Sequence, residues 1–67
     1  MDSLMAYDAP VAVELLRSAI REMRRRLVDG DVESCISMCD ATEIALWHGI
    51  DSPEMHAFKA IESARLA

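Results

Sequence analysis

One run of residues limits the fold of this chain more than any other feature. Between residues 9 and 28, large apolar side chains recur at spacings of 3, 4, 3 and 4 residues. This period places them along one side of an α-helix, as in helices that pack lengthwise against each other. A strand would need alternation at every second residue, so the pattern predicts a helix. The predicted packing seam consists of Val13, Leu16, Ile20, Met23 and Leu27.

Turn and cap residues divide the chain into three helices. Asp8 can cap the first helix, and Pro10 is tolerated in a first turn. Gly30 and Gly49 can adopt the left-handed conformation that ends a helix. The connection at Gly30 is so short that the first two helices must form an antiparallel hairpin. We therefore expect an all-α, three-helix protein, with helices over residues 9–28, 32–48 and 53–66, in one domain at 8–67 that follows a flexible lead-in at 1–7.

The third predicted helix carries a thin apolar face. Its two large apolar side chains on that face are Phe58 and Ile61, accompanied by Ala57 and Ala64. A face of this size can cover a neighbouring surface but cannot organise a core. We therefore expect the third helix to pack over the hairpin as a lid.

The apolar content of the chain exceeds what so small a domain can bury. Hydrophobic residues make up 52% of 67 residues, whereas a domain of this size buries only about 60% of its unfolded surface. Val11 and Leu15 lie on the side of the first helix away from the seam, where either Leu4 and Met5 or a second subunit could cover them. We expect a homodimer, because a second subunit commonly stabilises such small chains. The expected interface residues are Val11, Leu15, Ile20 and Met23.

The second predicted helix offers a surface for a partner protein. Ile44 lies away from its inward apolar stripe, and Trp47, the only tryptophan, lies at the edge of that stripe. Exposed aromatic and aliphatic side chains together are typical of protein interfaces, although Trp47 could instead belong to the core. Met38 adds a flexible apolar side chain. We expect partner binding through Met38, Ile44 and Trp47.

Helical spacing places Glu43 within the same apolar stripe. A buried carboxylate is costly unless a cation pairs with it. The first helix could supply that cation, either from the same chain or from a dimer mate, or Glu43 could reach solvent at the rim. The candidate partners of Glu43 are Arg17, Arg21 and Arg24.

The net charge of −5 is divided unevenly along the chain. Residues 1–26 hold four acids and five arginines, a balance of +1, while residues 27–67 hold eight acids, one lysine and one arginine, a balance of −6. Glu22 stands at helical pairing distance from Arg25 and Arg26. Three short helices have the outline of a helix-turn-helix protein, but so acidic a chain would repel a duplex. Nucleic acid is therefore not an expected partner.

The residues that commonly carry chemistry are few and badly placed. Cys35 and Cys39 share a helix face, but His48 lies about 180° away on the same helix, which argues against a zinc site. Two such cysteines also differ from the disulfide framework of a secreted mini-protein, which favours a cytoplasmic location. Neither a catalytic motif, a signal segment nor an apolar span of roughly 18 residues is present in the sequence. We expect no catalysis, cofactor, metal, small-molecule substrate or membrane insertion.

These features predict a non-enzymatic protein-interaction module. Its most concrete form is a small regulator, such as an inhibitor, anti-activator or adaptor, that binds a larger protein stoichiometrically through an exposed apolar helix surface. The alternative is a structural subunit or co-chaperone that folds only with an obligate partner.

Overall fold

The computed structural model describes residues 6–66, which form three α-helices. These are α1 (Ala9–Val28), α2 (Val32–His48) and α3 (Pro53–Leu66). Among the described residues, helix is the only regular secondary structure. The all-α prediction is confirmed, and each helix begins and ends at the residues expected from the sequence.

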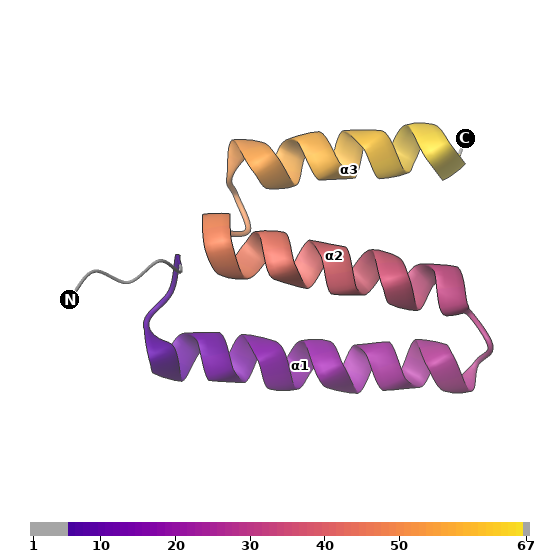
Figure 1. Ribbon diagram of the computed structural model, residues 1–67, viewed down its shortest axis with the longest axis horizontal. Helices are drawn as coiled ribbons and strands as arrows, with labels where there is room; N and C mark the ends of the chain where they lie inside the picture. Colours follow the sequence, from indigo (N-terminus) through magenta and orange to yellow (C-terminus); the bar gives the residue numbers. More distant parts are fainter. Residues whose placement is uncertain (1–5, 67) are drawn as a thin grey trace.

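The helices lie in one layer, with α2 in the middle (Figure 1). α2 runs antiparallel to both neighbours, and α1 and α3 each contact α2 but not each other. The Cα trace measures 40 × 25 × 13 Å, so the layer is about half as thick as it is wide. The expectation that α3 covers the hairpin as a lid is therefore wrong. Its thin apolar side, where Met55 is buried and Phe58 half-buried, suffices for contact with one helix but not with two.

The turn between α1 and α2 depends on Gly30. Its φ of 80° lies in the left-handed region, which favours glycine. The Gly30 N–H donates to the Leu27 carbonyl at 3.0 Å, and the Asp31 N–H donates to the Arg26 carbonyl at 2.9 Å. These two bonds form a Schellman motif that ends α1. The Asp31 carboxylate then accepts a bond from the Ser34 N–H at 3.1 Å, which caps the start of α2.

The turn between α2 and α3 depends on Gly49 and Ser52. Gly49 has a φ of 101° and donates its N–H to the Ala45 carbonyl at 2.9 Å. The buried Ser52 hydroxyl donates to the Gly49 carbonyl at 2.7 Å and accepts from the Met55 N–H at 3.1 Å. Ser52 thus joins the end of one helix to the start of the next.

Two residues of the lead-in expected at 1–7 are attached to the helices. The Ala6 N–H donates to the Leu46 carbonyl at 2.8 Å, and the Tyr7 hydroxyl accepts from the Ile50 N–H at 2.9 Å. Residues 1–5 lie outside the described residues, so the suggested cover of Val11 and Leu15 by Leu4 and Met5 is not described either.

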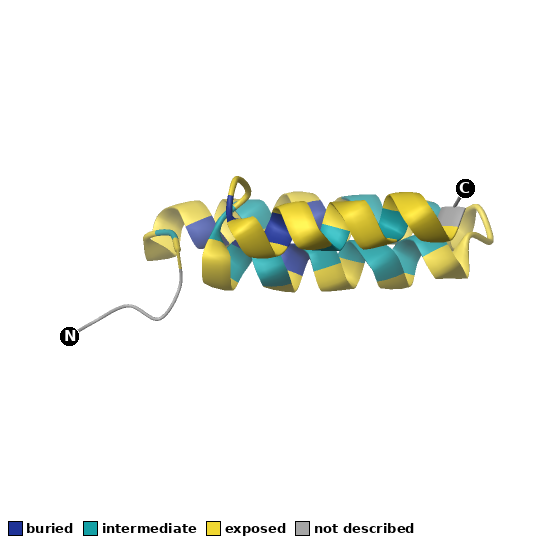
Figure 2. Ribbon diagram, turned by 90° about the horizontal axis from the view of Figure 1, so that it is seen from above, coloured by how far each residue is buried: buried dark blue, intermediate teal, exposed yellow. Residues whose placement is uncertain are grey.

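The buried positions in the contact between α1 and α2 hold small side chains. Ala12 and Ala19 are buried on α1, and Thr42 and Ala45 are buried on α2. Among the described residues, no large side chain is fully buried. Figure 2 shows that the buried positions are few, while the outer surfaces of all three helices are mostly exposed.

The seam expected on α1 therefore does not face α2. Met23 is half-buried, but Val13, Leu16, Ile20 and Leu27 are all exposed. The physical reason is the size of alanine. Ala12 and Ala19 let the two helices approach closely, and this leaves the larger apolar side chains beside the contact instead of within it.

Candidate protein-interaction surface

A shallow groove marks one face of the helical layer. Leu15 and Glu22 of α1 form one wall, and Met38 and Ala45 of α2 form the floor. Met55, in the first turn of α3, lines the other side.

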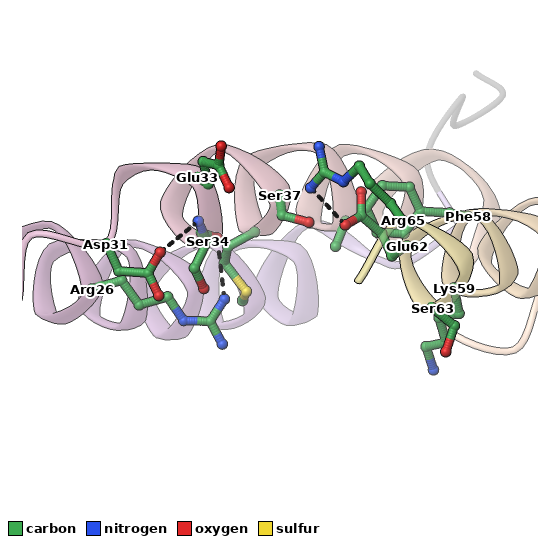
Figure 3. Close-up of a pocket in the computed structure, with 12 residues that line it drawn as sticks. Arg26, Asp31, Glu33, Ser34, Ser37, Phe58, Lys59, Glu62, Ser63 and Arg65 are labelled. Carbon is green, nitrogen blue, oxygen red and sulfur yellow. Dashed lines mark hydrogen bonds and ion pairs between the residues drawn. The ribbon is translucent and has the colours of Figure 1, made fainter. Parts of the chain in front are cut away.

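Toward the far ends of α1 and α3 the groove becomes polar (Figure 3). There the Arg26 guanidinium donates to the Ser34 carbonyl at 3.3 Å, and Arg65 pairs with Glu62 at 2.9 Å. Since these polar groups already bond to one another, this part of the groove is largely satisfied by the chain itself.

The opposite face of α1 and α2 is apolar and uncovered. Side chains advance by about 100° per residue around a helix. On α1, the line through Ala12 and Ala19 faces α2, and Leu15 and Glu22 lie on the groove side of that line. Side chains on the other side of the line therefore point away from the groove. The same holds on α2 for positions across from Met38 and Ala45. The side chains there are between 38% and 56% exposed, and we call this surface the apolar face. It consists of Val13, Leu16, Ile20 and Leu27 from α1, and Val32, Ile36 and Trp47 from α2.

Three sulfur-bearing residues fix how α1 and α2 are aligned. The Cys39 thiol lies 3.0 Å from the Met23 sulfur, and the Cys35 thiol lies 3.4 Å from the Met23 carbonyl oxygen. Met23 is therefore level with the midpoint between the two cysteines. Both helices rise by the same distance per residue. Arg17 lies six residues before Met23 on α1, and Glu43 lies six residues after the midpoint of the two cysteines on α2. Because the helices are antiparallel, Arg17 is level with Glu43. Within residues 6–66, no three His, Cys, Asp or Glu side chains converge to hold a metal ion.

The four residues expected at a dimer interface do not share one surface. Ile20 belongs to the apolar face, whereas Leu15 is half-buried on the groove side and Val11 is exposed on that same side. Met23 packs against the cysteines between the two helices. Val11 and Leu15 do lie opposite the seam, as expected, but the seam is the more exposed side.

The three residues expected to bind a partner are also divided. Trp47 belongs to the apolar face, and with Ile44 and Phe58 it lines a hollow between α2 and α3. Met38 lies in the groove on the opposite face. Trp47 and Ile44 can therefore act together, but Met38 cannot join them.

Glu43 is exposed among the side chains of the apolar face. Arg17 pairs with Glu14 at 3.5 Å, and both of these side chains are exposed. Within the described part of the chain, neither Glu43, Arg21 nor Arg24 makes an ion pair. The pair expected between Glu43 and these arginines is therefore absent inside one chain, and a pair with a second copy remains a prediction.

The end of α1 carries the ion pairs that the sequence predicted. Glu22 bonds to Arg25, and at 3.3 Å to Arg26. The hydrogen bond from Arg25 is the main reason that the pKa of Glu22 falls below its ordinary value. The same bond raises the pKa of Arg25. These charges are thus largely occupied within α1.

Among residues 6–66, the helices lack the combination of length and apolar content needed to cross a membrane.

Comparisons of the chain with protein-family models, curated proteins and solved structures found no match. Function must therefore be inferred from the surfaces themselves.

Proposed function

We propose that the protein is a non-enzymatic interaction module whose apolar face binds another protein chain, including a second copy of itself. The single helical layer carries this proposal. α1 and α2 meet through small side chains, and no described element covers the large apolar side chains on their outer face. The exposed parts of those side chains amount to on the order of 600 Å², which is at the upper limit for one patch on a monomeric protein.

The free energy available on this face is large enough for specific binding. At about 25 cal/mol per Å², covering 600 Å² contributes roughly 15 kcal/mol. Association itself costs about 4–15 kcal/mol, so the affinity depends on how closely the partner fits this face. The capped hairpin of α1 and α2 holds these side chains in one arrangement before binding, which limits the ordering cost. A small regulator, such as an inhibitor, anti-activator or adaptor, fits this surface.

A structural subunit or co-chaperone that folds with an obligate partner is the second candidate. It is favoured by one observation, the scarcity of large buried side chains among residues 6–66. The two candidates differ in the isolated chain. A regulator should show a cooperative thermal transition by circular dichroism, whereas an obligate subunit should melt gradually until its partner is added.

Two matched substitutions test the use of the apolar face. Ile36→Asp places a charge on that face, and Val28→Asp places one on the outer side of α1, where the valine is 86% exposed. The wild-type chain and both variants would be used as bait in the native cell, with quantitative mass spectrometry. The proposal expects one partner set to be retained by Val28→Asp and lost with Ile36→Asp. Equal capture by both variants would contradict it.

A further inference from the structure

We propose that a second copy of this chain occupies the apolar face, related by a twofold axis parallel to the helices. In this arrangement α1 of each copy packs on α2 of the other. The proposal rests on the proposed function, because it assigns a specific occupant to the same face.

Charge favours this pairing over the alternative of α1 on α1. By helical position, Arg17 and Arg24 flank the apolar face on α1, while Asp40 and Glu43 lie on or beside it on α2. Packing α1 on α1 would bring arginines against arginines and acids against acids. Packing α1 on α2 instead brings opposite charges together along both edges. Electrostatic complementarity of this kind selects register and partner.

The alignment within one chain sets the contacts between two chains. An axis parallel to the helices leaves each residue at its own level. Since Arg17 is level with Glu43 in one chain, Arg17 of one copy faces Glu43 of the other. Symmetry repeats this contact, so a dimer contains it twice.

The contact also accounts for an acidic residue on an apolar surface. Covering the face removes water from Glu43, which is costly for an unpaired carboxylate. Arg17 of the second copy offsets that cost. The ion pair between Arg17 and Glu14 is weak, because both side chains are exposed. Arg17 can therefore leave Glu14 and pair with Glu43 at little cost in free energy.

The apolar area supplies most of what a stable dimer needs. A standard interface buries about 800 Å² on each partner, and the apolar face offers on the order of 600 Å² before its charged edges are included. The resulting bundle has four central helices, each antiparallel to its neighbours, as in other four-helix bundles.

Charge reversal at two positions tests the pairing. Glu43→Arg and Arg17→Glu each turn two attractive contacts into two repulsive ones, so each should raise the dimer dissociation constant roughly tenfold or more. Mixing the two single variants should restore dimerisation, because the mixed dimer has one Arg17–Glu43 contact and one reversed contact. Sedimentation velocity measures all three samples, and circular dichroism checks that each variant is folded. Trp47 fluorescence gives a second readout, because α1 of the other copy covers this side chain.

Restoration by mixing separates this proposal from an ion pair within one chain, which mixing cannot repair. If both single variants weaken the dimer and the mixture does not recover, the α1-on-α2 pairing is wrong. If neither variant changes the dissociation constant, Arg17 and Glu43 do not meet and the proposal fails.

A monomeric wild-type chain would also overturn the dimer. Binding of a hydrophobic dye, reduced by Ile36→Asp, would then show that the apolar face is open and that the proposed function still stands. Without such dye binding, the proposed function would fail as well.

Discussion

Replacing Ala19 by leucine should separate α1 from α2, because Ala19 is only 2% exposed and lies in the contact between the two helices. The larger side chain fits only if the helices move apart, if it takes a strained rotamer, or if it extends into the groove that Ala19 lines. Such overpacking costs about 1–3 kcal/mol. The total stability of a chain of this length is roughly 3–10 kcal/mol, so Ala19→Leu should remove a substantial fraction of it.

The adjacent residue provides the control. Ile20 is 49% exposed, and alanine favours helix more strongly than isoleucine. In the monomer, Ile20→Ala should therefore change the free energy of unfolding by about 0.5 kcal/mol or less. Both variants would be compared in the Glu43→Arg background, which should weaken the proposed dimer, at concentrations where sedimentation velocity shows a monomer, by urea unfolding followed by circular dichroism.

The order of the two effects decides between two ways of packing α1. From the packing in the structure, we expect Ala19→Leu to be strongly destabilising and Ile20→Ala to be almost neutral. The seam expected from the apolar spacing would give the reverse order, since Ile20 would then be a core residue. A tolerated leucine at position 19, together with a damaging alanine at position 20, would refute the small-residue contact.

Three further substitutions test local features of the fold. Gly30→Ala should destabilise the chain by about 1 kcal/mol, because a φ of 80° strains any residue with a Cβ; an unchanged urea midpoint would show that the turn can relax. Ser52→Ala should cost about 1 kcal/mol through loss of the α3 cap, and calorimetry should show a lower Tm, whereas an equal Tm would mean that another group caps α3. Because Arg25 lowers the pKa of Glu22 in the folded state, this carboxylate stabilises the fold above its ordinary pKa of 4.5, and that stability is lost as the pH falls through the lowered value. Glu22→Gln should therefore flatten the acid side of the stability–pH curve, and an unchanged slope would contradict this role.

The helix ends could be predicted from the sequence because their causes are local. Gly30 supplies a left-handed backbone, and the side chains of Asp31 and Ser52 supply the caps. Each of these signals acts within four residues of the chain. Nothing distant in the fold can easily override them.

The packing surface of α1 could not be predicted in the same way. The spacing of Val13, Leu16 and Ile20 is regular, and large apolar side chains normally mark the buried side of a helix. The alanines at 12 and 19 carry little hydrophobic weight by themselves, and their role depends on the small residues Thr42 and Ala45 of the facing helix. The contact can be recognised only when both helices are considered together, because small side chains on α1 face small side chains on α2.

The position of α3 also escaped prediction, because its few apolar side chains are compatible with either a lid or an added helix at the edge.

For the candidate surface, the sequence correctly indicated a surplus of apolar side chains and singled out Trp47 and Glu43. It assigned Leu15 to the dimer interface and Met38 to the partner surface, whereas the structure places both on the groove side.

The central claim is that the chain leaves its own apolar face open to a second protein. Methyl NMR with a soluble paramagnetic agent tests this most directly, using Ile20 and Ile36 as probes and the half-buried Ile44 as an internal reference. At concentrations where the Glu43→Arg variant sediments as a monomer, the methyl groups of Ile20 and Ile36 should relax much faster than those of Ile44, and in the wild-type chain, which we propose is a dimer, this difference should largely disappear. Equal protection of all three isoleucines in the monomer would show that the chain covers this face by itself.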